Sequence, residues 1–451
     1  MDKKTMMENL AREAYEKGCF NGVWLYAENG EIVSKGALGF RDAEDSLPMT
    51  EDTIFEMASI TKMFTATAVM LLVREGKLGL DDAYVKYFPE YPYPEITLRH
   101  LLTHTSGMPD DFNTDRWVEP VLENEHRIPP NSEMLRFIRE SGEALACAPG
   151  EKFRYTDVGY TLLAEAVEKA AGVPFEAFLK QNIFEPAGMK DSAIYHTRRD
   201  GRPSDRFARN MSMDGGKLVP SDLSKYASYV VGSDGLNGCD YLYTTIFDML
   251  AWDRALREEK VLTRAEQALM FTPMKLNSGE TFLDEDGEGY GLGWAVADDP
   301  AFGPVVYHSG GMPGLSTWFE RFVDADRVLV RLCCREALDA RGADCFFKGM
   351  RAIMRDKEPG SIRCLEDYVV ENPDKSGWDA FCGVYDWDGH RIDVHWKEGE
   401  LFTIFRQGSW VSDEGRLYPL GDKTFGLKDE SSELVFGDGC LTFYGEEGKK
   451  L

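Results

Sequence analysis

Residues 59–72, SITKMFTATAVMLL, are the stretch that decides the fold of this chain. Lys62 is the only charged residue between Glu56 and Arg74. A run that is apolar nearly all round predicts a buried helix, and side chains three residues apart project from the same helical face. Ser59 and Lys62 are therefore expected side by side at the start of a buried helix.

The pairing of Ser59 with Lys62 has two interpretations. Burial of an ammonium is costly, and the usual response is a lowered pKa and a neutral amine. A neutral amine beside a serine hydroxyl is a general base beside its nucleophile. The alternative is a capping serine followed by a lysine whose ammonium extends to solvent. The pattern Ser-x-x-Lys is too common by chance to decide between them.

Two later segments favour the catalytic interpretation. Residues 152–157 read KFRYTD, and residues 307–311 read YHSGG. Together with Ser59 and Lys62 they resemble, in order, the three active-site elements of the serine β-lactamase and penicillin-binding-protein superfamily. The closer likeness is to its class C-like branch, which includes D-aminopeptidases, D,D-carboxypeptidases and β-lactamase-like esterases. Four more segments resemble this family, so the likeness spans about residues 15–335: residues 98–109, 159–189, 290–294 and 308–314.

This resemblance implies a serine hydrolase that forms an acyl-enzyme on Ser59. Lys62 and Tyr155 would share the proton transfers, and the backbone N–H groups of Ser59 and Gly311 would form an oxyanion hole. Gly310 and Gly311 suit a place where a substrate carbonyl approaches the backbone closely. The expected substrate is an amide or ester of a small molecule or short peptide, and no metal or organic cofactor is needed.

Two other functions stay open at this point. One is a carboxylesterase of the β-lactamase-like type. The other is a non-catalytic ligand-binding or assembly module on the same fold, although the presence of all three motifs argues against it.

Two positions depart from the pattern of the family. Asp157 stands where many relatives have asparagine, and an ionised carboxylate only accepts hydrogen bonds. It either pairs with Lys62 or attracts a cationic amine on the substrate. His308 stands where penicillin-processing members carry lysine, and a largely neutral imidazole attracts a β-lactam carboxylate less. Both departures predict weak or no β-lactamase activity.

Other polar groups give weaker signals. His100 and His104 are spaced i, i+4, but Leu101 stands where a metalloprotease has its glutamate, which favours a structural helix end over a zinc site. A local basic stretch either lines the rim of the cleft or pairs with surface acids: Arg198, Arg199, Arg202, Arg206 and Arg209.

Composition excludes several classes of partner and compartment. The 451 residues carry 51 basic and 78 acidic side chains, a net charge of −27, which argues against nucleic acids and anionic membranes as partners. Nine cysteines without regular spacing, no signal-peptide core and no long apolar run predict a cytoplasmic protein with reduced thiols. The sequence leaves the oligomeric state open.

Periodicity predicts an α+β fold, an antiparallel sheet flanked by helices with an inserted helical lobe. Asn29-Gly30 joins two strand-like runs into a hairpin. About residues 80–275 show mainly helical sequence patterns. The strands of the sheet come from the parts of the chain before and after this helical region. The expected outer elements are a helix at 5–18, strands at 20–28, 31–39, 293–297, 305–308, 316–323 and 327–333, and a closing helix at 345–356.

The C-terminal part changes character. We expect a hydrolase domain over residues 1–356, a linker over 357–377 and a β module over 378–451. Gly, Asp and Glu turns separate short apolar runs there, which predicts a small antiparallel barrel-like sheet. Those runs are 384–387, 392–397, 401–406, 410–412, 416–419, 424–427, 433–436 and 440–444, and the expected core residues are Trp378, Trp387, Trp396 and Trp410.

Overall fold

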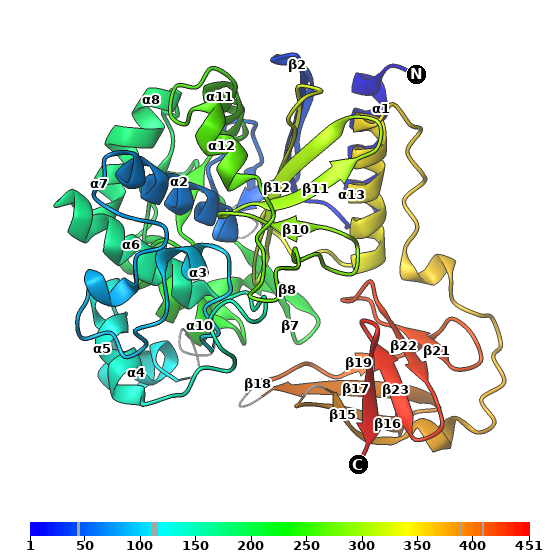
Figure 1. Ribbon diagram of the computed structural model, residues 1–451. Helices are drawn as coiled ribbons and strands as arrows, with labels where there is room; N and C mark the ends of the chain where they lie inside the picture. Colours follow the sequence, from blue (N-terminus) through cyan, green and yellow to red (C-terminus); the bar gives the residue numbers. More distant parts are fainter. Residues whose placement is uncertain (43–45, 110–115, 388, 408–409) are drawn as a thin grey trace. The chain divides into compact units, whose positions relative to one another are not determined.

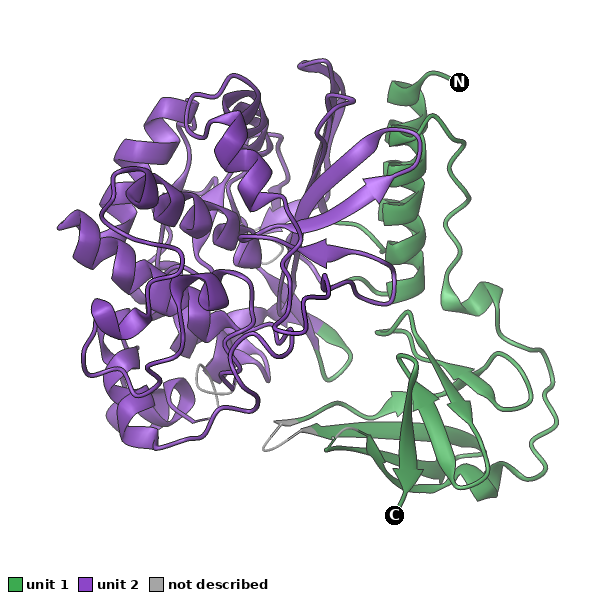
Figure 2. Cartoon of the chain, in the orientation of Figure 1, with its two compact units in different colours: residues 1–21, 214–217, 337–451 green, residues 22–213, 218–336 purple. Residues whose placement is uncertain are grey.

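The computed structural model describes residues 1–451 apart from 43–45, 110–115, 388 and 408–409, and apart from the side chains of Gln407 and Trp410. The chain forms two compact units, coloured separately in Figure 2. Unit 1 comprises residues 1–21, 214–217 and 337–451, and unit 2 comprises residues 22–213 and 218–336. All predicted site residues belong to unit 2.

Unit 2 is built on a seven-stranded antiparallel sheet with the order β10-β11-β12-β13-β14-β1-β2. The strands are β1 (Gly22–Glu28), β2 (Glu31–Leu38), β10 (Gly289–Tyr290), β11 (Ala295–Asp299), β12 (Gly303–Met312), β13 (Leu315–Phe322) and β14 (Arg327–Cys333). β1 pairs with β14 from Gly22↔Cys333 to Glu28↔Arg327. Strands from the two ends of the segment therefore lie side by side, as the sequence predicts, and Figure 1 shows them in blue and yellow-green.

The β1–β2 hairpin shows why the local pattern was informative. Asn29 has φ 50° and Gly30 has φ 76°, the two positive angles that a tight hairpin turn requires. Residues 22–27 of β1 are all buried, and because successive side chains of a strand point to opposite faces, both faces of β1 are covered.

A helical lobe is inserted between these strands. Its helices are α2 (Thr61–Arg74), α3 (Leu98–Leu102), α4 (Val118–Glu125), α5 (Met134–Ser141), α6 (Asp157–Ala171), α7 (Phe175–Leu179), α8 (Glu185–Ala187), α9 (Thr197–Asp200), α10 (Ala227–Gly232), α11 (Ile246–Arg257) and α12 (Arg264–Met270). α2 packs against α6, and α11 lies against β1 and β14. The buried helix predicted after Ser59 is confirmed, because every residue from Thr61 to Leu72 is buried.

Three two- or three-residue strands bring distant parts of the lobe together. β5 (Phe55–Glu56) pairs with β9 (Leu242–Thr244), which also pairs with β6 (Ala193–Ile194). The pairing of β5 with β9 places the segment just before β9 beside the segment just after β5, where Ser59 lies. Two further short pairs are β3 (Phe40–Asp42) with β4 (Leu47–Pro48) and β7 (Met211–Asp214) with β8 (Lys217–Pro220).

Unit 1 contains two helices that pack together, α1 (Lys3–Glu16) and α13 (Ala340–Met354). α13 begins five residues before the expected position. The side chain of Asp339 caps it by accepting a hydrogen bond from the backbone N–H of Gly342, and such a cap stabilises a helix start that the apolar pattern alone does not mark.

The C-terminal part of unit 1 is one ten-stranded antiparallel sheet. Its strands are β15 (Gly383–Trp387), β16 (His390–Lys397), β17 (Glu400–Gln407), β18 (Trp410–Val411), β19 (Gly415–Arg416), β20 (Tyr418–Pro419), β21 (Thr424–Gly426), β22 (Glu433–Phe436), β23 (Cys440–Phe443) and β24 (Glu446–Lys450). The predicted barrel-like module is thus confirmed. The sequence missed β24, whose residues EEGKK show no apolar alternation, although β24 pairs with both β15 and β23.

The aromatic core of this module differs in part from the expected one. Trp378 is buried and Trp387 packs against the core, but Trp396 is 39% exposed. The side chain of Trp410 lies outside the described part. Ile362 and Leu365 of the expected linker are buried. The division into a domain, a linker and a module stays a prediction.

Within the described part of the chain, no helix has both the length and the apolar character that crossing a bilayer requires.

Candidate active site

Ser59 lies in a single 3₁₀ turn, η1 (Ala58–Ile60), directly before α2. Ala58 has φ 46° and is fully buried, a left-handed conformation that non-glycine residues adopt rarely and mostly where the surroundings impose it. The backbone N–H of Met57 donates to Leu242 O at 2.8 Å, and Thr317 Oγ1 donates to Met57 O at 2.9 Å. Both the lobe and the sheet therefore hold the turn that presents Ser59.

Lys62 is completely buried one turn after Ser59. Its Nζ donates to Ser59 Oγ at 2.8 Å, to Asp157 Oδ1 at 2.5 Å and to the backbone oxygen of Cys239 at 3.2 Å. An ammonium has three N–H donors, so each of them has an acceptor.

The charge state of Lys62 corrects the expectation of a neutral amine. Burial lowers the pKa of Lys62, but attraction to Asp157, and then to Tyr155 and Asp240, raises it well above the ordinary value. The resting side chain is an ammonium because the ion pair outweighs desolvation. Of the two alternatives for Asp157, the structure shows the pairing with Lys62.

Tyr155 lies in the loop before α6 and is 39% exposed. Nζ of Lys62 lies 5.0 Å from the centre of its ring. Burial raises the pKa of Tyr155, and although Lys62 lowers it, the net pKa lies above the ordinary value. The phenol is therefore protonated in the resting site and able to donate.

Asp240 is a site residue that the sequence did not reveal. Its Oδ1 lies 3.5 Å from Ser59 Oγ, and the side chain is only 6% exposed. Burial and the nearby Asp157 raise the pKa of Asp240 to about 7. Asp240 lies just before β9, and no motif marked its segment; only the pairing of β9 with β5 brings it to Ser59.

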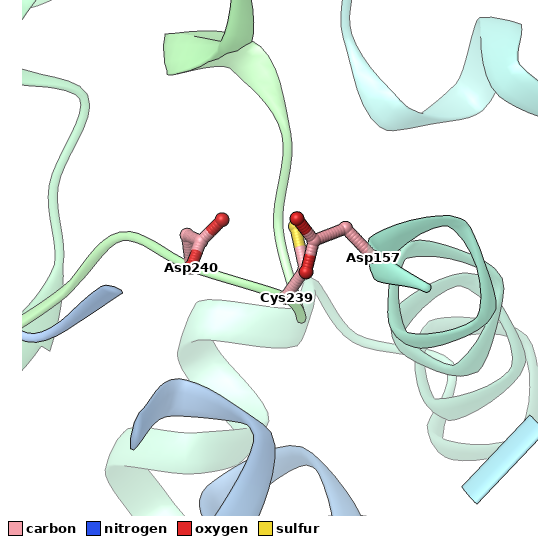
Figure 3. A group of neighbouring side chains, drawn as sticks. All are labelled: Asp157, Cys239 and Asp240. Atoms are coloured by element: carbon pink, nitrogen blue, oxygen red, sulfur yellow. The ribbon is translucent and has the colours of Figure 1, made fainter. Parts of the chain in front are cut away.

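Asp157, Cys239 and Asp240 place three possible metal-ligating atoms within 4.8 Å of one another. Figure 3 shows Asp157 at the start of a helix and the other two on a neighbouring segment. Burial raises the pKa of Cys239 well above the ordinary value. The Lys62 ammonium already bonds to Asp157 and to the Cys239 carbonyl. The group therefore suits the lysine better than a metal ion.

The third motif, residues 307–311, lies on β12, which runs beside η1. Its pairing with β11 ends at Tyr307, so the next five residues have β13 on one edge and approach η1 on the other. A Cβ at Gly310 would lie 2.2 Å from Met57 O, whereas a Cβ at Gly311 would meet nothing within 4 Å. Gly310 thus lets the strand approach η1, and Gly311 faces open space.

His308 is 4% exposed, and both of its ring nitrogens have partners. Nε2 lies 2.9 Å from the Tyr290 hydroxyl, and Nδ1 lies 2.6 Å from Ser309 O. Burial and the charge of Lys62 lower the pKa of His308 to about 4. The imidazole is neutral at physiological pH, in agreement with the sequence analysis.

These residues surround a cavity of about 290 Å³. It is lined by Ser59, Tyr155, Tyr290, Ala295, Tyr307, His308, Ser309 and Gly311. Of the predicted site residues, Ser59, Tyr155, His308 and Gly311 line this cavity. Lys62 contacts Ser59, Asp157 contacts Lys62, and Gly310 packs against the turn that carries Ser59. Among the described lining residues there is no lysine or arginine, so nothing in the lining balances a substrate carboxylate.

His100 and His104 do not act together. Nδ1 of His100 accepts from the backbone N–H of Thr97 and completes the cap of α3. His104 instead bonds with its ring to Tyr290 and Thr156. The two imidazoles therefore have separate hydrogen-bond partners.

The basic stretch pairs with acids. The pairs include Arg198–Glu56 at 2.8 Å, Arg199–Asp200 at 2.7 Å, Arg202–Asp42 at 2.6 Å, Arg206–Asp191 at 2.8 Å and Arg209–Asp222 at 3.3 Å.

Comparison with known proteins agrees with this geometry. Residues 7–346 match the Beta-lactamase family. The chain belongs to the Beta-lactamase family. The resemblance noted from the three motifs is confirmed, and the protein is a serine hydrolase by family.

Two relatives and one solved structure illustrate the range of this family. Penicillin-binding protein 4* of Bacillus subtilis (strain 168) is 33% identical over 338 residues, which cover 74% of this chain and 72% of that protein. Esterase EstB of Burkholderia gladioli is 28% identical over 337 residues, with coverages of 65% and 80%. The octameric penicillin-binding protein homologue from Pyrococcus abyssi aligns over 100% of both chains with a TM-score of 0.67 and 23% identity, which shows that the fold is shared.

Proposed function

We propose that this Beta-lactamase family protein hydrolyses an amide or ester bond of a small molecule or short peptide through an acyl-enzyme on Ser59. The observation that carries the proposal is the 2.8 Å contact between Lys62 Nζ and Ser59 Oγ, beside Tyr155 and at the wall of a cavity. A nucleophile, a proton-transfer group and space for a substrate therefore coincide.

The ion pair defines the first proton movement. Because the resting Lys62 is an ammonium, it must lose a proton before it can accept one from Ser59. Asp157 Oδ1, at 2.5 Å, is the acceptor for that proton. The neutral amine then takes the Ser59 proton while Oγ bonds to the substrate carbonyl carbon.

Tyr155 completes the cycle. Its protonated phenol donates to the leaving amine or alcohol as the bond to the acyl carbon breaks. Water then attacks the acyl-enzyme by the reverse proton path and releases the acid. The Ser59 and Gly311 N–H groups stabilise the oxyanion in both halves, a contribution of about 3 kcal/mol for each donor.

The charges of the site favour some substrates over others. The lining lacks a basic side chain, and Lys62 is neutralised by Asp157. A substrate with a carboxylate beside the scissile bond, such as a penicillin, gains no ion pair here. Amides and esters without that carboxylate are the better substrates.

A carboxylesterase is the second candidate, favoured by the 28% identity to Esterase EstB. A panel of D- and L-amino-acid amides, short peptides and short-chain esters separates the two. Hydrolysis of esters alone favours the esterase.

The acyl-enzyme itself is tested by intact-mass analysis after treatment with a fluorophosphonate. We expect one adduct, lost in Ser59→Ala and retained in Ser309→Ala, a serine that lines the same cavity. An adduct that persists in Ser59→Ala contradicts the assignment. No adduct and no turnover with any substrate would favour the non-catalytic alternative.

A further inference from the structure

We propose that His104 is the positioning residue of this site: it holds the residues before and after Tyr155 and, through the hydroxyl of Tyr290, supports the tautomer of His308 that the carbonyl of Ser309 requires. For its kinetic part this inference rests on the proposed function. Its structural part stands on contacts alone.

The first set of contacts surrounds Tyr155. The carbonyl oxygen of His104 accepts from the backbone N–H of Arg154 at 2.7 Å. Its Nδ1 accepts from the backbone N–H of Thr156 at 3.2 Å. Between these two bonds the rings of His104 and Tyr155 stack, with centroids 4.1 Å apart and 28° between their planes. One residue therefore fixes the backbone on both sides of Tyr155 and one face of its ring.

His104 adopts an unusual backbone conformation to make these contacts. It has φ 55° and is fully buried. A left-handed conformation at a non-glycine residue costs free energy and persists where the surroundings impose it. It lets the carbonyl and the ring of His104 reach the same short segment.

The second set of contacts runs through Tyr290 to His308. Nε2 of His104 lies 3.2 Å from the Tyr290 hydroxyl, and that hydroxyl lies 2.9 Å from Nε2 of His308. Nδ1 of His308 lies 2.6 Å from the carbonyl oxygen of Ser309. The four groups form one continuous chain of hydrogen bonds.

The direction of hydrogen-bond donation is fixed at both ends of this series of hydrogen bonds. A backbone N–H only donates, so Nδ1 of His104 is unprotonated and Nε2 carries the proton. A carbonyl only accepts, so Nδ1 of His308 carries the proton and Nε2 is unprotonated. The Tyr290 hydroxyl satisfies both histidines by accepting from His104 and donating to His308. The two neutral histidines must therefore be opposite tautomers.

The surroundings keep both rings neutral. Burial and the positive charge of Lys62 lower the pKa of His104 well below its ordinary value and that of His308 to about 4. The other titratable groups that face His104 are Tyr155, Tyr160 and Tyr290, all protonated phenols at neutral pH. A charged His104 would stabilise a Tyr155 anion and remove the donor, so a fixed neutral ring suits the proposed role of Tyr155.

The decisive experiment is nitrogen NMR on the full chain labelled with ¹⁵N-histidine. The chain has seven histidines, and the variants His104→Gln and His308→Gln assign the two signals. We expect the protonated nitrogen to be Nε2 in His104 and Nδ1 in His308, with no titration of either between pH 6 and 8. The same tautomer in both, or titration of either near pH 6.5, overturns the inference. This result does not depend on any enzymatic activity.

Kinetics test the positioning role. His104→Asn retains a short acceptor for the Thr156 N–H, whereas His104→Leu does not. We expect His104→Leu to lower kcat by about a hundredfold while KM stays within about threefold of the parent's value. The kcat of His104→Asn should be at least about tenfold higher than that of His104→Leu. Tyr290→Phe should lower kcat. Tyr84→Phe also removes a buried hydroxyl, one that donates to the backbone oxygen of Leu162, and it should not lower kcat.

Unchanged kcat in His104→Leu, or equal losses in Leu and Asn variants, contradicts the positioning role. If no substrate is turned over and Ser59 is not labelled, the proposed function fails, while the two tautomers still decide the structural part.

Discussion

Oδ1 of Asp157 lies 2.5 Å from Nζ of Lys62 in the buried centre of the site. This pair holds the lysine as an ammonium at rest, and it places a proton acceptor directly beside that lysine. The expected consequences can be measured.

Asp157→Asn should shift the pH dependence of the reaction. Without the carboxylate, the pKa of Lys62 falls, because Asp157 makes the largest contribution that raises it. The variant, however, lacks the proton acceptor inside the site, so Lys62 must release its proton to solvent before Ser59 can react. We expect the acid limb of kcat/KM against pH to move up by one unit or more, since that profile reports groups of the free enzyme. An unchanged limb, with exposed Asp81→Asn as the control, would show that Lys62 is not the titrating base.

Lys62 and Tyr155 should act as one proton-transfer unit. Lys62→Ala and Tyr155→Phe should each lower kcat by about three decades, and the double variant little more than the worse single, because residues that act together are non-additive. Steady-state rates with one ester substrate suffice. Losses that multiply fully would place the two residues in separate steps.

Asp240→Asn should change how stability depends on pH. The pKa of Asp240 is about 7 in the fold against an ordinary value of 3.8. Between these values the folded state keeps a proton that the unfolded state has released, so this group lowers the free energy of unfolding as pH rises from about 4 to about 7.

The asparagine variant lacks this penalty. We expect it to gain stability relative to the parent at pH 8 but not at pH 4, by a few kcal/mol at most, since one pKa unit corresponds to about 1.4 kcal/mol. Urea unfolding at both pH values measures it. An equal difference at both pH values would show that Asp240 titrates normally.

Penicillins and cephalosporins should be poor substrates. Neutral His308 and a cavity lining without lysine or arginine leave a β-lactam carboxylate without a cation. His308→Lys should raise the ratio of β-lactam acylation to ester turnover by about tenfold. Both rates come from the same variant, so a general loss of activity cancels. Efficient penicillin turnover by the unchanged protein would refute the argument.

Much of the fold could be predicted from local patterns. Asn29-Gly30 predicted the hairpin, the apolar run after Ser59 predicted a buried helix, and residues 327–333 form β14 as expected. Such elements are encoded by neighbours in the sequence, because turn angles and burial periodicity act over a few residues. β24 was missed because its residues, EEGKK, show no such period. They form a strand by pairing with β15 and β23.

The site was predictable as a set of residues but not as a set of charges. The three motifs located Ser59, Lys62, Tyr155, Asp157, His308, Gly310 and Gly311, and their catalytic roles stay predictions. The protonation of Lys62 depends on Asp157, which is 95 residues away in the sequence. It also depends on Asp240, which contacts Ser59 from a position 181 residues further along the sequence. The role inferred for His104 depends likewise on Tyr290, 186 residues away.

Sequence by itself therefore determined the family, the order of the sheet-forming segments and the identity of the nucleophile candidate. Only the tertiary structure decided which groups are charged and which nitrogen of each histidine carries a proton. The physical reason is that a buried group takes its pKa and its tautomer from the few atoms within hydrogen-bonding distance, and in this site those atoms come from segments that only folding brings together.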